Sequence, residues 1–214
     1  MKELVYLEPN RLDAEPFTTS DVVAEFVGIT HRRIKSSIVK HMDSLQVFGK
    51  VVQYGATLGG RGNEVGYRLN EQQATLLMTF LKNTPTVIEF KVELVRQFYA
   101  MRTELNTRHG YRAELKPIRR ELTDAIQAIP DVSKWAYKQY TDLAYKTALG
   151  SNAAQLRKAR GADKKAAAID YMTADEIHAV ARAQNHITTL IELGMDYSQV
   201  KSMLMDRKVL GRIA

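Results

Sequence analysis

Apolar residues between Thr18 and Asp43 recur at three- and four-residue intervals, in two runs separated by a short break. This spacing is typical of two amphipathic helices, each with one apolar face. Ser20 has the side chain of a good N-cap for the first helix, and Gly28 ends it, because glycine adopts the left-handed conformation at little cost. The apolar stripe of this first helix comprises Val22, Val23, Phe26 and Val27.

The second run predicts a helix from about His31 to about Asp43, with Thr30 as its N-cap. At about 100° per residue, one side of this helix is apolar and the other is polar. The apolar side holds Ile34, Ile38 and, just past the end, Leu45; the polar side holds Arg32, Arg33, Ser36 and Lys40. Two helices joined by a short turn containing glycine are typical of a helix-turn-helix.

A predicted β-hairpin follows the two helices. Residues 51–58 have strand character, with Gly55 as a possible bulge, and residues 65–69 form the return strand. The glycine-rich tip between them carries Arg61 and Asn63. A hairpin in this position is the wing of a winged helix, and its tip is suited to a neighbouring groove or phosphate. Residues 4–7 predict a lead-in strand.

Two further helices are expected in the N-terminal half. Asn70 and Gln73 form a capping box for a helix over 71–81, which is apolar almost all round and therefore buried. A longer helix is expected over 85–105, beginning at Pro85. Its broad apolar face is either a dimer seam or the back of the same domain. This face comprises Val87, Ile88, Val92, Val95, Phe98, Tyr99, Met101 and Leu105.

The remainder of the chain predicts helices alone, expected over 111–129 (with a possible break at Pro117), 133–149, 151–160, 174–193 and 199–205. Thr173 and Glu176 form a second capping box. Charge and glycine interrupt the periodicity at His109 and Gly110, so we place a domain boundary there. The predicted fold is mostly α with a small β-hairpin: a winged helix-turn-helix domain over 1–108 and an all-α domain over 109–214.

The distribution of charge strengthens the case for a polyanionic partner. The chain of 214 residues has a net charge of +7. Residues 1–29 contain two basic and six acidic residues, whereas residues 30–61 contain six basic residues and one acidic residue. This segregation is what a positively charged docking face requires. Double-stranded DNA is therefore the expected partner, although amphipathic helices with a basic outer face are also common in soluble proteins that bind no DNA.

Other classes of protein receive little support from the sequence. The chain has no cysteine, no apolar run long enough to span a bilayer and no signal peptide, so a cytoplasmic location is expected and a membrane partner is not. Asp175 and His178 form a lone pair without further metal ligands, and no hydrolase or metalloprotease motif is present. We therefore expect neither an enzyme nor a bound metal or cofactor.

The order of these segments resembles a known family. The stretch TTSDVVAEFVGITHRRIKSSI, the hairpin ending in GYRLNEQQATLLM and the helix IEFKVELVRQFYAM are similar to the Rha family of phage regulatory proteins and, more distantly, to phage antirepressor N-terminal domains. The resemblance covers about residues 17–105 and implies a phage or prophage origin, a role in gene regulation and the cytoplasm of a bacterial host. It also adds His31 to the candidate residues. The wing departs from the family, because it is longer and richer in glycine.

The resulting candidates for DNA binding are His31, Arg32, Arg33, Lys35, Ser36, Lys40, Arg61 and Asn63. Residues 134–205 resemble a C-terminal domain of phage antirepressors, in which Tyr140, Asp142 and Tyr145 are closest to the shared pattern; aromatic residues at such spacing more often belong to a core. Two hypotheses follow. The chain is a transcriptional regulator that binds DNA as a homodimer or higher oligomer, or it is an antirepressor that binds a phage repressor protein through its C-terminal helices.

Overall fold

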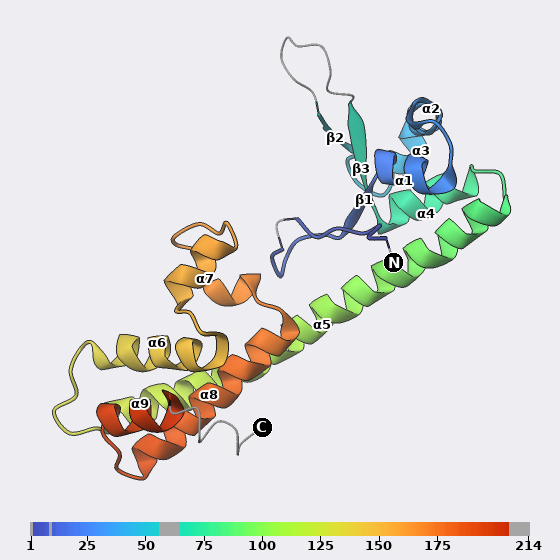
Figure 1. Ribbon diagram of the computed structural model, residues 1–214. Coiled ribbons are helices and arrows are strands. Elements are labelled where there is room, and N and C mark those ends of the chain that lie inside the picture. Colours follow the sequence, from blue (N-terminus) through green and yellow to red (C-terminus); the bar gives the residue numbers. More distant parts are fainter. Residues whose placement is uncertain (1, 9, 56–64, 206–214) are drawn as a thin grey trace. The chain divides into compact units, whose positions relative to one another are not determined.

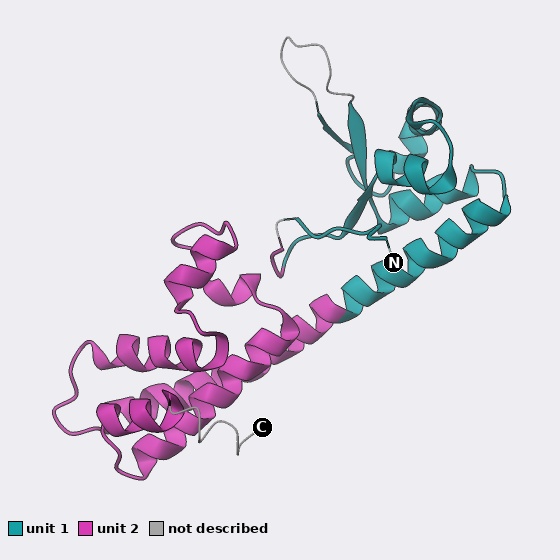
Figure 2. Ribbon diagram, viewed as in Figure 1, with its two compact units in different colours: residues 1–9, 13–103 teal, residues 10–12, 104–214 magenta. Residues whose placement is uncertain are grey.

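The computed structural model describes residues 2–8, 10–55 and 65–205 (Figure 1). It is mostly helical, with 66% of residues in helices, and carries one small three-stranded sheet, which confirms the predicted fold class. The chain forms two compact units, shown in Figure 2. Unit 1 comprises residues 1–9 and 13–103, and unit 2 comprises residues 10–12 and 104–214. No helix in the described ranges is long and apolar enough to cross a membrane.

Unit 1 combines an antiparallel sheet with short helices. The strands are β1 (Phe17–Thr19), β2 (Val52–Tyr54) and β3 (Gly66–Asn70), in the order β1-β3-β2. Thr18 pairs with Leu69, and Gln53 pairs with Tyr67. The helices are α1 (Ser20–Val27), α2 (His31–Lys40), α3 (Met42–Gln46), α4 (Glu71–Thr79) and the first part of α5 (Pro85–Gln127).

The prediction of a lead-in strand over residues 4–7 was wrong. This segment forms a single β-bridge, between Tyr6 and Phe17, and the strand itself is β1. The physical reason lies in α5, where the side-chain oxygen of Gln97 accepts hydrogen bonds from the backbone N–H groups of Leu4 (2.7 Å) and Val5 (3.2 Å). These donors are satisfied by a side chain, so the segment needs no neighbouring strand.

The helix expected from His31 to about Asp43 is interrupted. α2 ends at Lys40, and α3 begins at Met42. At the break, the His41 ring stacks on Phe80 with a centroid separation of 3.8 Å. Leu45, expected on the buried side, is indeed fully buried, but it enters the core from α3. The apolar pattern predicted burial correctly and missed the change of helix.

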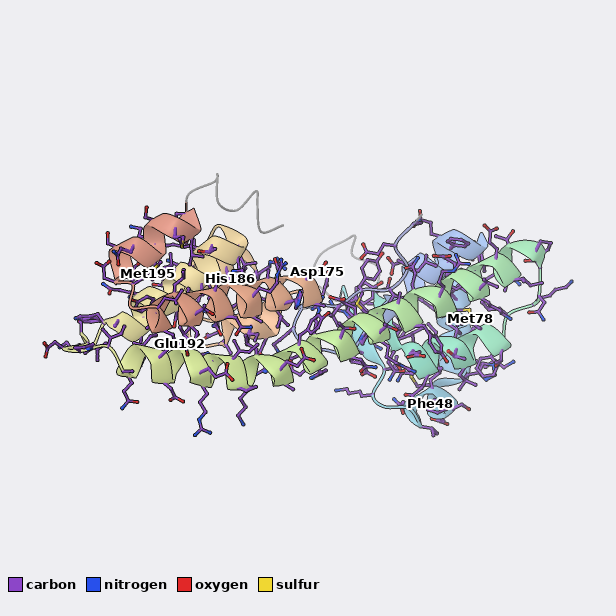
Figure 3. The ribbon with its side chains drawn as sticks, turned by 90° about the horizontal axis from the view of Figure 1, so that it is seen from below. Phe48, Met78, Asp175, His186, Glu192 and Met195 are labelled. Carbon is purple, nitrogen blue, oxygen red and sulfur yellow. The ribbon has the colours of Figure 1, made fainter. Side chains whose placement is uncertain are left out.

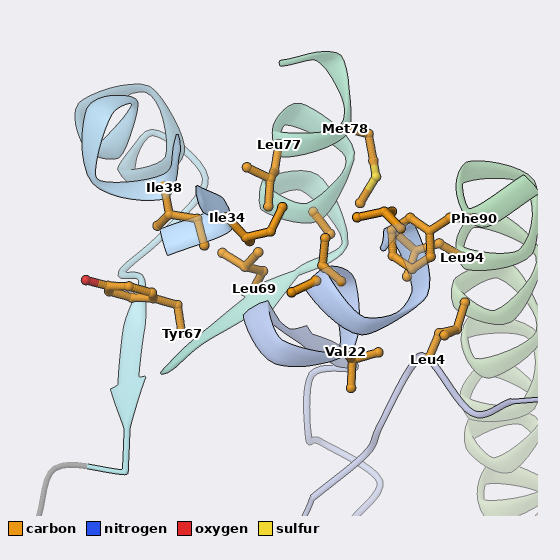
Figure 4. Packing of buried hydrophobic residues seen from close by; sticks show 14 of the residues in the cluster. Leu4, Val22, Ile34, Ile38, Tyr67, Leu69, Leu77, Met78, Phe90 and Leu94 are labelled. Atoms are coloured by element: carbon orange, nitrogen blue, oxygen red, sulfur yellow. The ribbon is translucent and has the colours of Figure 1, made fainter. Parts of the chain in front are cut away.

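The core of unit 1 unites the sheet with all of its helices. Figure 4 shows Ile34, Leu69 and Leu77 in this cluster, which come from α2, β3 and α4. Phe90 and Leu94 of α5 complete it. The capping box of Asn70 and Gln73 is present at the start of α4, as predicted. The helix predicted over 71–81 ends at Thr79. It is less buried than predicted, because Phe80, within the predicted range, is 37% exposed.

α5 continues well beyond its expected end at Leu105. It runs through Gly110 and Pro117 without interruption, so the two helices predicted over 85–105 and 111–129 are one. Packing outweighs the local breakers in this region. Arg108, two residues before Gly110, is 4% exposed and bonds to Glu104 (2.9 Å) and to Asn10 (2.7 Å). The buried, hydrogen-bonded Arg108 before Gly110 and the buried Leu115 after it are packed in unit 2, and this tertiary packing holds the glycine backbone in the helix.

Unit 2 is helical throughout its described part. Besides the rest of α5, it contains α6 (Ala136–Leu149), α7 (Ala153–Ala159), a 3₁₀ turn (Ala168–Tyr171), α8 (Ala174–Glu192) and α9 (Tyr197–Met205). α6 packs along α8, with Leu143 and Ile187 in their shared core. The predicted capping box of Thr173 and Glu176 is present at the start of α8.

Candidate nucleic-acid interface

α2 has one buried and one exposed side, as its sequence predicts. Ile34 and Ile38 are 1% and 0% exposed, and they anchor the helix in the core of unit 1. The exposed residues include the predicted Arg32, Arg33, Ser36 and Lys40. We call these four residues the polar face of α2. A helix held by apolar side chains and presenting cations and a hydroxyl to solvent has the features required for contacts to phosphates and base edges.

The cations of this polar face are exposed and carry charge that the described part of the chain does not neutralise. Arg32, Arg33 and Lys40 form no ion pair with any residue that the structure describes. Other arginines in the same unit are paired. Arg68 contacts Glu8 and lies over the Phe17 ring, and Arg102 bonds to Glu71. Arg68 and Arg102 are thus engaged in contacts within unit 1, whereas Arg32 and Arg33 have no such partner among the described residues and can bind an external anion.

Lys35 and His31 differ from the polar face. Lys35 is half-buried and already engaged in an interaction within the chain. His31 is also half-buried, and its Nε2 lies 2.8 Å from the hydroxyl oxygen of Ser20. His31 therefore secures the start of α2 to α1, and the exposed positions on either side of Ile34 remain the predicted contacts to DNA.

Ser20 connects three elements and does not cap α1. The N-cap position is Thr19, and the fully buried Ser20 hydroxyl instead accepts a hydrogen bond from the Tyr67 N–H at 3.0 Å. With its bond to His31, one side chain joins α1, α2 and β3. Since β3 is a strand of the predicted wing, Ser20 fixes α2 relative to the wing. The sequence pattern gave no signal for this role, because serine near a helix start is expected to cap it.

The turn between α1 and α2 has the predicted geometry. Gly28 is left-handed, with φ of 66°, and its N–H bonds to the Ala24 carbonyl oxygen. Thr30 occupies the N-cap position of α2, but among the described residues its side chain makes no capping hydrogen bond. The backbone carbonyl of Thr30 accepts from Arg33 N–H at 2.9 Å instead. The turn is thus set by glycine rather than by a side-chain cap.

β2 and β3 pair antiparallel and form the base of the predicted wing. Of the strand expected over 51–58, the structure describes residues 51–55 and shows a strand over Val52–Tyr54, and the return strand starts at Gly66. The Tyr54 ring covers Gly66, where a Cβ atom would lie 2.3 Å from it, and the Tyr54 hydroxyl bonds to Asp21. This contact ties β2 to α1. Arg61 and Asn63, which the sequence places at the tip, are outside the described residues.

Two side chains that sequence reasoning assigned to capping alone also hold the approach to the wing. The Asn70 amide donates to the Phe48 carbonyl at 2.8 Å, and the Gln73 amide donates to the Gly49 carbonyl at 2.8 Å. Gln73 is 1% exposed. The start of α4 therefore fixes the connection from α3 to β2, and with it the base of the wing.

The predicted protein-partner residues lie in unit 2. Tyr140 and Tyr145 are 2% and 7% exposed, and burial raises the pKa of both phenols. The Tyr140 ring packs edge-on against Tyr197. Asp142 is half-buried. The two aromatic residues thus have the core position that such spacing more often indicates.

The described residues contain no group of three or more His, Asp or Glu side chains that could hold a metal ion. The His178 ring, from the pair noted with Asp175, stacks against Tyr111 with a centroid separation of 5.2 Å. Figure 3 shows Asp175 near the start of α8 and His186 farther along the same helix. His178 therefore has a packing role.

Comparison with known proteins supports the resemblance. Residues 18–103 match the family model described as phage regulatory protein Rha. This match covers α1 to α4, most of the sheet and the first part of α5, and it supports a role as a phage regulator. The description is that of a regulator rather than an enzyme. No curated protein matches the chain.

Proposed function

We propose, from the match of residues 18–103 to the phage regulatory protein Rha family, that this chain regulates phage transcription by binding duplex DNA. In this proposal, α2 is the recognition helix and enters the major groove, and the hairpin tip contacts a neighbouring groove or phosphate. The protein acts in the cytoplasm of a bacterial host, where phage DNA is transcribed.

The observation that supports the proposal most strongly is the polar face of α2. Arg32 and Arg33 are exposed and form no ion pair with described residues. The next residue of α2, Ile34, is buried in the core and anchors the helix. Neighbouring cations repel one another, and contact with the phosphates of DNA would neutralise them. The anchored helix also holds the backbone of these residues in place before binding. This preorganisation lowers the entropy that is lost when DNA binds.

The exposed side chains have different proposed roles. Arg32, Arg33 and Ser36 contact base edges, because arginine reads guanine through two hydrogen bonds and serine can pair with several bases. Lys40 contacts a phosphate, as does Lys35 if it exchanges its present interaction. Arg61 and Asn63 contact DNA from the wing. His31 supports the helix from behind through its bond to Ser20.

Selection of bound duplexes from a random pool, with the full chain as bait, tests the proposal. We expect enrichment of one motif of limited length, and a log–log dependence of affinity on salt with a slope of about −0.9 per phosphate contact. Binding without any enriched motif would contradict sequence-specific regulation. Absence of duplex binding at low salt would contradict DNA binding altogether.

The antirepressor hypothesis is the competing proposal. It requires contact residues on the surface of unit 2, and two of its three candidates, Tyr140 and Tyr145, are buried. A full chain carrying Arg32→Ala and Arg33→Ala separates the hypotheses. If this variant still displaces a phage repressor from its operator, the antirepressor hypothesis is supported; if displacement and DNA binding are lost together, DNA binding explains both.

A further inference from the structure

The part of α5 in unit 1 carries two apolar stripes. The inner stripe consists of Val87, Phe90, Leu94 and Phe98, all at most 2% exposed, and it forms one wall of the core. Figure 4 shows two of these residues, Phe90 and Leu94, facing the other members of the cluster. The outer stripe consists of Ile88, Val92, Val95 and Tyr99, which are 50%, 54%, 47% and 58% exposed. We call these four residues the outer seam. Each residue of the outer seam lies one or two positions after a residue of the inner stripe. Successive residues of a helix are turned by about 100°, so the two stripes face different directions.

The outer seam has the spacing of a coiled-coil interface. Its residues are separated by four, three and four positions, which is the heptad pattern of the a and d positions. β-Branched residues fill three of the four positions. An amphipathic helix that merely covered its own domain would need the inner stripe alone, because the outer seam contributes nothing to that core.

We propose that the outer seam binds the outer seam of a second copy of this chain, with the two α5 helices antiparallel. The occupant is a second copy because the seam is complementary to itself. A two-fold axis between Val92 and Val95 places Val92 against Val95 of the partner subunit and Ile88 against Tyr99 of the partner subunit. Such a contact closes on itself and produces a dimer, not a filament.

The charges beside the seam favour the antiparallel orientation. Glu89 and Arg96 lie on the same flank of the seam, seven residues apart. In the antiparallel dimer, Glu89 lies near Arg96 of the partner subunit, and the symmetry creates this pair twice. A parallel dimer would instead bring Lys91 near Arg96 of the partner subunit, and two like charges would repel. In the free chain, Arg96 bonds to Glu93 at 2.9 Å, so it can share or exchange acidic partners.

A groove beside the seam provides space for a side chain of the second copy. Its volume is about 470 Å³, and it is lined by Phe26 of α1 together with Lys2, Glu89, Val92, Glu93 and Arg96. Val92 thus lies at the edge of a concave, partly apolar surface formed by α1 and α5. A knob from a second helix packs into such a hole.

The seam is short, which sets the strength of the expected dimer. From Ile88 to Tyr99 it spans about 17 Å at 1.5 Å per residue. An interface of this length lies at the low end of the sizes of specific interfaces, so we expect a dissociation constant on the order of micromolar. The dimer does not depend on the proposed DNA binding, but it would make that binding symmetric.

Sedimentation velocity of the full chain at roughly 1–100 μM tests the proposal. We expect a concentration-dependent dimer, and the variant Val92→Glu should weaken it about tenfold or more. Val47→Glu is the matched control, because Val47 is also an exposed valine of unit 1, with 77% exposure, and lies outside the seam. Far-UV circular dichroism verifies that both variants remain folded. A monomer at every concentration, or a dimer that both variants leave intact, would overturn the proposal.

Charge reversal tests the orientation. Glu89→Arg and Arg96→Glu should each weaken the dimer, and the double variant should restore it. Because the chain has no cysteine, introduced thiols give a second measure. Val92→Cys mixed with Val95→Cys should form a mixed disulfide faster than either variant forms a disulfide with itself; preferential Val92→Cys self-linking would indicate a parallel dimer and overturn the proposal. A monomer that binds a single, unrepeated DNA site would reject the dimer alone, whereas a dimer without DNA binding would reject the proposed function alone.

Discussion

The hydroxyl group of Ser20 and the imidazole of His31 share a hydrogen bond of 2.8 Å between two helices of the helix-turn-helix. The same hydroxyl accepts from the Tyr67 N–H of β3. Ser20 is fully buried, so water cannot replace either bond. Besides the apolar anchors Ile34 and Ile38, this one small side chain therefore contributes to the orientation of α2 relative to α1 and β3.

Replacing Ser20 by alanine should destabilise unit 1. The substitution leaves the Tyr67 N–H buried without an acceptor, and an unsatisfied buried donor costs about 1–3 kcal/mol. Urea denaturation followed by circular dichroism would measure the change in the free energy of unfolding. Ser44→Ala, at an exposed position of α3, is the control and should change stability by less than about 0.5 kcal/mol. Equal stabilities for the two variants would show that the Ser20 bonds contribute nothing.

Removal of the arginines of the polar face should weaken DNA binding and leave the fold intact. Arg32→Ala with Arg33→Ala should cost about 1–3 kcal/mol per lost base contact and relax the sequence preference. Fluorescence anisotropy with the selected duplex and with a scrambled duplex would measure both effects. Lys82→Ala, at an exposed position between α4 and α5, is the control for a simple loss of charge. If the double variant binds both duplexes as the wild type does, α2 is not the recognition helix.

Two glycine-to-alanine substitutions should have effects of opposite sign. Gly28 has φ of 66°, so Gly28→Ala strains the turn between α1 and α2 and should destabilise by about 1 kcal/mol. Gly110 lies within α5, where Gly110→Ala should stabilise by about 0.5–1 kcal/mol. Neither added Cβ would meet another atom within 4 Å, so the backbone alone decides the sign. Thermal denaturation measures both, and destabilisation by Gly110→Ala would contradict the continuous helix.

Glu104 should make the stability of unit 2 depend on pH in the acid range. Burial opposes ionisation of this carboxylate, but hydrogen bonds from the Ala174 N–H and from Arg108 lower its pKa below 4.5. A carboxylate whose pKa is lower in the folded state stabilises above its unfolded pKa, and this contribution is lost as the pH falls through the folded value.

Glu104→Gln should therefore reduce the dependence of unfolding free energy on pH below about 4.5, and lower the stability at neutral pH. Urea titrations between about pH 3 and 7 would measure this dependence. Glu121→Gln, at an exposed position of the same helix, is the control. If Glu104→Gln and the wild type lose stability in parallel as the pH falls, Glu104 is not responsible for the acid sensitivity.

Local patterns in the sequence determined which side of each helix is buried. The alternation that placed Ile34 and Ile38 inward and Arg32 and Arg33 outward follows from the helical repeat alone, and the structure confirms it. The left-handed turn at Gly28 and the capping box of Asn70 and Gln73 were predictable for the same reason. Each depends on residues within four positions of one another.

Contacts between distant residues decided the rest. Gln97 satisfies the backbone of Leu4 and removes the expected strand. Arg108 bonds to Asn10 beside Gly110, where a domain boundary was expected, and Ser20 bonds to Tyr67 where a cap was expected. These partners are separated by 47 to 98 positions. Sequence periodicity describes neighbours within a helix or strand, so it cannot identify which distant group satisfies a buried donor or acceptor. The tertiary structure makes that assignment.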